Sequence, residues 1–161
     1  MKRTRKVIGI DPGLADTGFG IVQGAGSQVG DYRFGTIQTS KTDALPYRLE
    51  HIYSELSSLL KAEKPDLIVI EDVFSLKEYP KSGIVLGKVC GVILLACSQC
   101  GIGTMELPVK EVKRVLTGNG NARKDQTERA VRHFLKRETP IKPSHASDAL
   151  ALALVGLMRH R

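Results

Sequence analysis

The sequence predicts an α/β fold: a mixed five-stranded sheet with an antiparallel opening meander, then parallel strands, and helices on both faces. Three observations predict it. Residues 6–10 and 66–71 are short apolar runs, typical of strands buried on both faces. Three strand-like segments open the chain one after another. Strand-like and helical segments then alternate, and helices end the chain, as in a sheet covered on both sides.

The opening meander is predicted from three segments and one turn. Residues 6–10, 17–22 and 31–39 form its strands, and residues 24–30 form the turn between the second and the third. Residues 45–62 then form an amphipathic helix. Its apolar face consists of Leu49, Ile52, Leu56, Leu59 and Leu60.

The second part of the chain alternates between strands and helices. We expect Ser144 to cap the last helix, because serine is a favoured N-cap residue. In order, we predict a strand at 66–71, a helix at 80–100, a strand at 101–106, helices at 109–116 and 123–137 with a Gly/Asn loop at 117–121 between them, a connector at 138–143, and a helix at 144–159.

Length and composition predict one globular domain, residues 1–161. Hydrophobic residues make up 42% and charged residues 25% of the chain, which is ordinary for a soluble protein. No apolar run reaches the ~20 residues of a membrane span. Residues 84–97 come closest, and Lys88 interrupts them. The apolar run behind the basic first residues is too short for a secretory signal, so we expect a cytoplasmic protein without a membrane partner.

Charge and cysteine content narrow the function further. The net charge of +7 and the pI near 9.5 suit a polyanionic partner such as nucleic acid. Cys90, Cys97 and Cys100 share one face of a predicted helix. We interpret them as small buried hydrophobic residues rather than a redox or metal pair, because no second pair or nearby histidine accompanies them.

Four polar residues stand out against apolar surroundings. Asp11 and Glu71 each end an apolar strand, and acids on neighbouring strand ends, ~4.8 Å apart, can converge. His145 and Asp148 are three positions apart, on one face of a helix that is apolar on nearly every side. We therefore expect these four side chains to meet at one edge of the sheet.

Three carboxylates and one imidazole predict a site for hard divalent cations. Oxygen ligands suit Mg²⁺, and the added imidazole favours Mn²⁺ as the alternative. A cation would also offset the repulsion between carboxylates held so close together. Two ions ~3.5–4 Å apart would activate a water molecule and stabilise the leaving oxygen in phosphodiester cleavage. The basic surface would then hold the nucleic acid.

The motifs of the chain, taken in order, resemble those of RuvC-type Holliday junction resolvases, in the ribonuclease H/retroviral integrase superfamily. The resemblance covers nearly the whole chain and implies a ribonuclease H-like sheet. It rests on Gly9-Ile10-Asp11-Pro12-Gly13 with Thr17-Gly18, Ile70-Glu71-Asp72-Val73-Phe74, the segment from Gly87 to Gly91, Val112-Lys113, Gly118-Asn119-Gly120-Asn121, and Ser147-Asp148-Ala149-Leu150-Ala151.

This resemblance implies an endodeoxyribonuclease of DNA recombination and repair. It implies a homodimer that binds four-way DNA junctions, makes two symmetric nicks with 5′-phosphate ends, and works with branch-migration motor proteins. The family's catalytic, metal-binding carboxylates fall on Asp11, Glu71 and Asp148. His145 stands where the family often has aspartate. Because imidazole titrates near pH 6.5, we expect activity to fall below that pH as His145 takes up a proton.

The resemblance also implies DNA contacts and a dimer contact. Phe74 takes the place of an aromatic residue that inserts at the junction centre, and Lys113 and Lys124 correspond to DNA-contacting lysines. Arg123 precedes Lys124 and extends this basic track. In the long helix Gly83, Gly87 and Gly91 form a smooth stripe. The stripe either packs on the protein's own sheet or, as the resemblance implies, contributes to the dimer interface.

Three alternatives belong to other classes of function. A nucleotide phosphotransferase of the actin or sugar-kinase type also opens with Asp-x-Gly, but it needs a second such domain, for which 161 residues leave no room. A non-catalytic junction-binding dimer would have no use for three intact acids, whose clustering is costly. A ribonuclease H-like nuclease acting on RNA–DNA hybrids would share the same acids, and mapping the cleaved substrate would distinguish it.

Overall fold

The computed structural model describes residues 3–73 and 80–160. Within this part of the chain, the elements are β1 (Arg5–Asp11), β2 (Asp16–Ala25), β3 (Gln28–Gln38), α1 (Leu45–Glu63), β4 (Leu67–Asp72), α2 (Pro80–Gln99), β5 (Thr104–Pro108), α3 (Val109–Thr117), α4 (Lys124–Leu135) and α5 (Ser144–Arg159). Their order and types agree with the prediction, and several boundaries differ.

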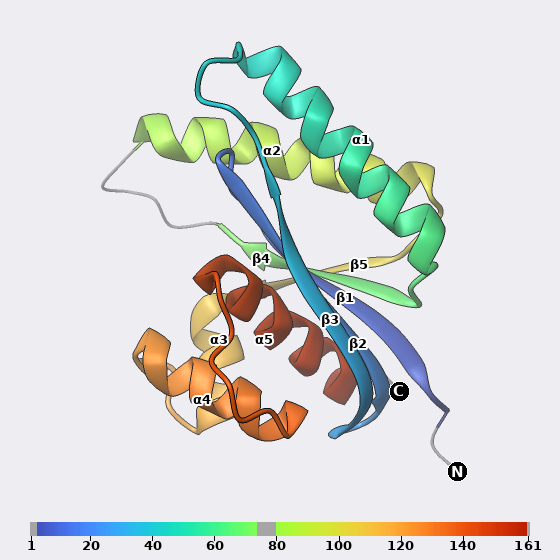
Figure 1. Cartoon of the computed structure of the whole chain (residues 1–161), viewed down its shortest axis with the longest axis vertical. Coiled ribbons are helices and arrows are strands. Elements are labelled where there is room, and N and C mark those ends of the chain that lie inside the picture. Colours follow the sequence, from blue (N-terminus) through green and yellow to red (C-terminus); the bar gives the residue numbers. More distant parts are fainter. Residues whose placement is uncertain (1–2, 74–79, 161) are drawn as a thin grey trace.

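The strands form one five-stranded sheet in the order β3-β2-β1-β4-β5. β1 pairs antiparallel with β2, and β2 antiparallel with β3, whereas β4 runs parallel to both β1 and β5. Figure 1 shows α1 and α2 on one face of this sheet and α3, α4 and α5 on the other. The predicted mixed sheet, with its antiparallel meander and helices on both faces, is confirmed.

The apolar run of β1 divides its side chains between two cores. Val7 belongs to the core shared with α5, while Ile8 and Ile10 belong to the core shared with α1 and α2. Because side chains alternate along a strand, Asp11 faces the same side as Val7. β4 divides in the same way, and Glu71 faces the α5 side with Val69. Burial on both faces explains why both strands are apolar until they end in an acid.

Glycines on β1 and β2 allow α5 to pack directly on the backbone of the sheet. A Cβ atom on Gly9 would lie 1.9 Å from the carbonyl oxygen of Ala149, and one on Gly18 would lie 2.1 Å from that of His145. Any larger residue at these positions would force the helix away from the strands. The first turns of α5, and the side chains they carry, therefore lie at the ends of β1 and β2.

Three of the boundaries that differ, and one predicted cap that is wrong, have a local reason. The turn after β2 comprises only residues 26–27, because Gly26 adopts the positive φ of 62° that a tight hairpin turn uses. β5 starts at Thr104 rather than residue 101, because Gly101, at a φ of 68°, first completes the end of α2. α4 ends at Leu135, since Lys136 is left-handed. Ser144 is the first helical residue of α5 and not its cap: Pro143 takes that place, and no side chain caps the helix.

The cysteines follow the interpretation that they are small hydrophobic residues. Cys97 is fully buried in the core under α1 and α2, and Cys90 and Cys100 are partly buried. All three are free thiols. Burial raises the pKa of Cys90 to about 11 and that of Cys97 to about 12, so neither thiol is activated.

Candidate active site

The two strand-end acids lie level with each other on neighbouring parallel strands. Ile10 of β1 is in register with Ile70 of β4, so Asp11 and Glu71 occupy the next position on each strand. Both face α5, and their carboxyl groups are hydrogen-bonded to each other. The expectation that these two acids converge is confirmed.

The first turns of α5 bring the other two predicted residues to the same place. The Nδ1 atom of His145 lies 2.8 Å from Oδ2 of Asp11 and, as the donor, leaves Nε2 of the neutral ring as the remaining acceptor. Asp148 follows one turn later on the same face of the helix and raises the pKa of Asp11 through its charge. All four residues therefore belong to one site, although 137 positions separate Asp11 from Asp148.

These side chains line a hollow of about 200 Å³ between β1, β4, α3, α4 and α5. Its polar rim holds the four predicted ligands together with two lysines. Apolar residues from α3 and α5 form the rest of the wall, which lowers the local dielectric and strengthens every charge interaction inside. The complete lining is Asp11, Glu71, Val109, Val112, Lys113, Lys124, Thr127, His145, Asp148, Ala151 and Leu152.

Burial makes the two strand-end acids unusually basic. It raises the pKa of Asp11 to about 6, against the lowering effect of a hydrogen bond from Glu71. Burial also raises the pKa of Glu71 to about 8, and the adjacent carboxyl of Asp11 raises it further. Near neutral pH the pair therefore retains a proton, which belongs to the pair and not to either carboxyl group alone. A bound cation would displace that proton.

Two lysines supply positive charge to the same hollow. The Nζ atom of Lys124 lies 3.4 Å from Oδ2 of Asp148, and its charge also lowers the pKa values of Asp11 and Glu71. Lys113 of α3 lines the hollow from the opposite helix. Both lysines that the resemblance assigned to DNA contact therefore lie beside the acids.

The donor set fits divalent cations by its chemistry. Three carboxylates and one imidazole offer the oxygen and nitrogen ligands that Mg²⁺ and Mn²⁺ accept, and burial raises the pKa values of Asp11 and Glu71, so a cation would favour their ionised forms. Within the described ranges, however, no three His, Cys, Asp or Glu side chains surround a single point at which an ion could sit. The four ligands face one hollow and are held by local partners instead.

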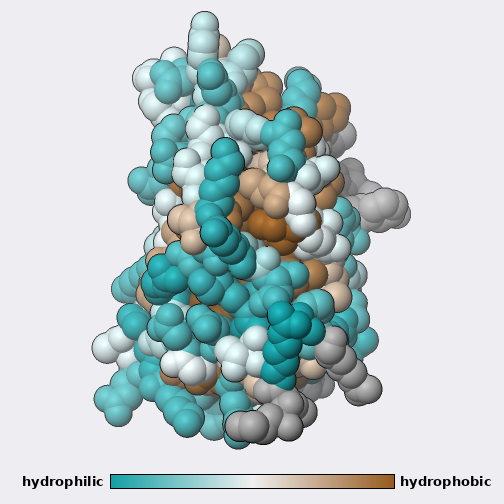
Figure 2. Space-filling model, turned by 90° about the vertical axis from the view of Figure 1, so that its right-hand side faces the viewer, coloured by the Kyte–Doolittle hydropathy of each residue, from teal (hydrophilic) through white to brown (hydrophobic). Residues whose placement is uncertain are grey.

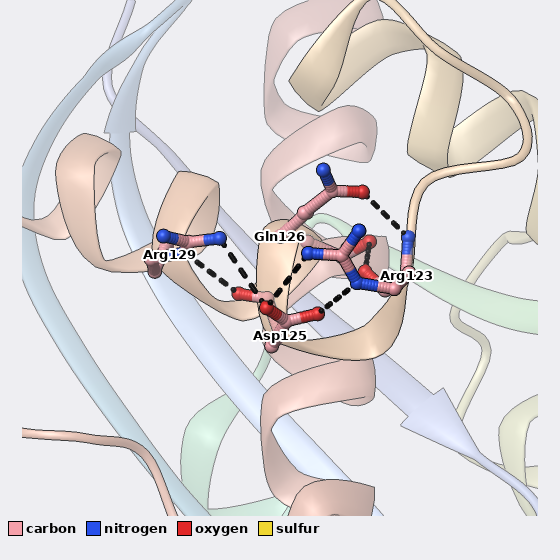
Figure 3. Close-up of polar contacts among 5 residues, drawn as sticks. Arg123, Asp125, Gln126 and Arg129 are labelled. Carbon is pink, nitrogen blue, oxygen red and sulfur yellow. Dashed lines mark hydrogen bonds and ion pairs between the residues drawn. The ribbon is translucent and has the colours of Figure 1, made fainter.

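Arg123 is placed differently from the lysines. Its guanidinium pairs with Asp125, which also pairs with Arg129 one turn further along α4 (Figure 3). Its backbone N–H donates to Oε1 of Gln126, which helps to start α4. Arg123 itself does not line the hollow, but the next residue, Lys124, does. The prediction for Phe74 falls on residues 74–79, outside the described ranges.

Two polar residues that the sequence analysis did not single out also support the site. Thr127 lines the hollow and donates its hydroxyl to the carbonyl of Arg123. Glu128 accepts a hydrogen bond from the backbone N–H of Ile141, which fastens the connector before α5 to α4. Thr127 follows Arg123 by four positions, and Glu128 follows Lys124 by four. This spacing could have pointed to both residues, because residues four apart share a helix face.

Comparisons with known proteins agree with this geometry. The family model described as "Crossover junction endodeoxyribonuclease RuvC" matches residues 7–156. The RuvC crossover junction endodeoxyribonuclease of Caldicellulosiruptor saccharolyticus is 37% identical over 154 residues, which cover 95% of this chain and 92% of that protein. The enzyme of the same name from Gloeobacter violaceus is 39% identical over 158 residues, 96% of this chain and 89% of its own length.

Solved structures show the same likeness in three dimensions. Thermus thermophilus RuvC superposes with a TM-score of 0.84 at 27% identity, over 95% of this chain and 93% of that one. The same protein in complex with a Holliday junction substrate gives a TM-score of 0.88 at 27% identity, over 96% and 93% of the two chains. From the family match, the relatives and the shared fold, the chain belongs to the RuvC family of crossover junction endodeoxyribonucleases.

Proposed function

We propose that this chain is a structure-selective endodeoxyribonuclease that resolves four-way DNA junctions in recombination and repair. The observation that carries the proposal is the hollow in which Asp11, Glu71, His145 and Asp148 meet beside two lysines. Membership of the RuvC family and the likeness to a relative bound to a Holliday junction support it. Each subunit of a homodimer would make one nick, in strands of like polarity, and leave a 5′-phosphate.

Mg²⁺ or Mn²⁺ would be held, as two ions, by the three carboxylates and by His145. When bound, the ions would activate a water molecule and stabilise the leaving oxygen. Asp11 and Glu71 would have to be ionised to serve as ligands, which burial alone opposes. His145 fixes the carboxyl group of Asp11 through Nδ1. Lys113 and Lys124 hold the DNA phosphates at the mouth of the hollow, where the apolar wall from α3 and α5 limits water.

A second copy of the chain would cover the outer face of α2. Ile84 and Leu95 are 63% and 51% exposed there, and nothing lies within 4 Å of a Cβ atom placed on Gly87 or Gly91. By length and composition, the segment Lys81–Gln99 could also cross a membrane. Its inner face, however, packs in the core with Val89 and Ile93. A two-fold dimer through this face would match the pseudo-two-fold symmetry of a junction.

Figure 2 shows one side of the molecule, with apolar side chains gathered in its upper part, where α1 and α2 lie in Figure 1. The lower part of that side is mostly hydrophilic. An apolar patch of this kind marks an interaction surface in most proteins. We further propose a cytoplasmic location and cooperation with branch-migration motor proteins, in line with the family.

An immobile four-way junction with Mg²⁺ or Mn²⁺ tests the function. We expect symmetric nicks, mapped at single-nucleotide resolution, that Asp11→Asn and Glu71→Gln reduce by about 10³-fold or more while junction binding is retained. Asp72→Asn is the matched control, because Asp72 follows Glu71 on β4 but points away from α5. Dominant cleavage of RNA–DNA hybrid or plain duplex, or binding without any nick, would overturn the proposal.

The pH dependence of the activity tests the role of His145. A proton taken up by the imidazole would remove its lone pair and add a positive charge beside Asp11, so we expect the acid limb of the activity to depend on His145. His145→Asp should change this acid limb, because a carboxyl group then replaces the imidazole beside Asp11. A pH–rate profile of that variant with an unchanged acid limb would contradict the assignment of His145 as a ligand.

A further inference from the structure

Three of the four ligands of the hollow are engaged in two separate pairs. His145 holds Asp11 at 2.8 Å, and Lys124 holds Asp148, with 3.4 Å between Nζ and Oδ2. In the described part of the chain, no three of the acids and histidines close around a common point. The negative charge of Asp148 is therefore neutralised by the ammonium of Lys124, and not by a cation shared with the other three ligands.

The ammonium of Lys124 has the electrostatic role of a cation in this site. It pairs directly with Asp148, and its charge favours the ionised forms of Asp11 and Glu71 against the effect of burial. It therefore acts on all three carboxylates. Lys113 lines the same hollow, but within residues 3–73 and 80–160 it forms no ion pair with them.

Lys124 is also largely exposed to solvent. Its side chain is 71% exposed and belongs to the first residue of α4, at the end of the Gly/Asn loop. An exposed ion pair contributes only about 0–1 kcal/mol, so a competing phosphate can break it. The pair is therefore weak enough to be exchanged for a contact between Lys124 and a phosphate.

The Lys124–Asp148 pair stands between two hollows. Both residues line the hollow of about 200 Å³, and both also line a second, more open hollow of about 710 Å³. The second hollow lies between the start of α4 and the connector and first turn of α5, and it includes Lys142 and Ser147. Lys124 and Asp148 are thus shared by the two hollows, and Lys124 can be reached from both.

We propose that Lys124 is a resident cation, which occupies Asp148 while DNA is absent and leaves it when a DNA phosphate attracts its ammonium. Asp148 is then available to the divalent cation. This inference rests on the proposed function and adds a regulatory step to it: metal loading and DNA binding favour each other, because each removes Lys124 from Asp148. Such coupling is reciprocal, so DNA raises metal affinity by the factor by which metal raises DNA affinity.

Titration of the DNA-free protein with Mn²⁺, with the free ion measured by electron paramagnetic resonance, tests the first half. We expect Lys124→Met to bind Mn²⁺ about two- to fivefold more tightly than wild type, which is the effect of removing an exposed ion pair. Lys113→Met is the matched control and should change the affinity by less than about twofold. Equal affinities in wild type and Lys124→Met, or an equal gain in Lys113→Met, would overturn the inference.

Junction binding with and without Ca²⁺ tests the second half. Fluorescence anisotropy of a labelled four-way junction gives the factor by which Ca²⁺ tightens binding, and a gel of the same samples verifies that no strand is cut. We expect this factor to be about threefold or more larger in wild type and Lys113→Met than in Lys124→Met. Equal factors in all three proteins would contradict the exchange.

The two failures can be told apart. If wild-type protein with Mg²⁺ leaves the junction intact, the proposed function fails, whatever the Mn²⁺ titration shows. If it nicks the junction but the three proteins bind Mn²⁺ equally, only the exchange of Lys124 fails. Because the side chain of Lys124 is largely exposed, we expect all variants to unfold at the same urea concentration as wild type.

Discussion

Two long apolar helices flank the sheet, and they differ in what covers them. In α5, eleven of sixteen residues are buried, from Ala146 to Leu157. In α2, the buried side chains among those described are Val89, Ile93, Ala96 and Cys97, and apolar residues also face outward. An apolar sequence alone therefore does not say whether a helix is internal. The neighbours of each residue decide whether it serves the fold or a partner.

The glycines of the two regions show the same contrast. Gly9, Gly18 and Gly20 face α5, where a Cβ atom would meet backbone within 2.6 Å. Gly87 and Gly91 lie on α2, where a Cβ atom would meet nothing within 4 Å. The first set lets α5 touch the sheet. The second set leaves a smooth surface that no other part of the described protomer covers.

The largest effect on stability should come from a side chain inserted where α5 contacts the sheet. Gly9→Ala places a methyl group 1.9 Å from the carbonyl of Ala149 and 2.7 Å from the amide of Ala153, and neither backbone atom can yield. We expect a loss of about 3 kcal/mol or more in the free energy of unfolding, measured by urea denaturation. Gly30→Ala on β3 is the control, since its nearest neighbour would be at an ordinary 3.7 Å. Equal stability of the two variants would show that α5 does not depend on this contact.

A charge on the outer face of α2 should act on assembly and not on the fold. Leu95→Glu replaces a half-exposed side chain, so the protomer should stay folded, whereas a dimer through α2 would have to bury a carboxylate. We expect the dimer dissociation constant to rise roughly 30-fold or more, measured by analytical ultracentrifugation. Val115→Glu, an exposed site on α3, should leave it unchanged. A dimer that survives Leu95→Glu would place the interface elsewhere.

The buried acids on the α5 side of the sheet also lower the stability of the folded protein when they are ionised. The pKa values of Asp11 and Glu71 are raised above their unfolded values, so the folded protein binds more protons than the unfolded chain between about pH 4 and 8. Without metal, stability should therefore fall as pH rises through this window. Glu71→Gln should remove most of the fall and gain about 1 kcal/mol or more at pH 8 in EDTA, measured by urea denaturation.

The neighbouring Asp72 supplies the control for this titration. It lies one residue further along β4 and points to the other face of the sheet. Asp72→Asn should not reproduce the gain of Glu71→Gln. If the free energy of unfolding of the wild-type protein in EDTA does not change between pH 5 and 8, ionisation of Asp11 and Glu71 does not destabilise the fold.

Much of the site follows from the sequence, because its parts lie at the ends of strongly patterned elements. Asp11 and Glu71 end apolar strands, and the register between those strands follows from their parallel pairing. The links between Asp11 and His145 and between Asp148 and Lys124 could not be predicted, since they depend on side-chain orientation across elements far apart in the chain. The capping role expected of Ser144 was wrong, because the preceding proline already has the extended backbone of a cap.

The sequence leaves two interpretations of the glycine stripe open, and the structure distinguishes between them. A stripe of small residues fits tight packing on the protein's own sheet as well as it fits a partner. The open space around Gly87 and Gly91 contradicts the first reading. The periodicity of α2 could not decide this, because apolar residues lie on both its inner and outer faces.

The smallest effect should come from filling the glycine stripe. Gly87→Ala and Gly91→Ala meet no neighbour in the protomer, and alanine in a helix interior is more favourable than glycine by about 0.5–1 kcal/mol. In the monomeric Leu95→Glu background, each should therefore raise the free energy of unfolding by that amount in urea denaturation. In the otherwise unchanged chain the same methyl groups should weaken the dimer, because they separate two helices that meet through glycine. A loss of stability in the monomeric background would instead mean that the stripe packs within the protomer, and that α2 is as internal as α5.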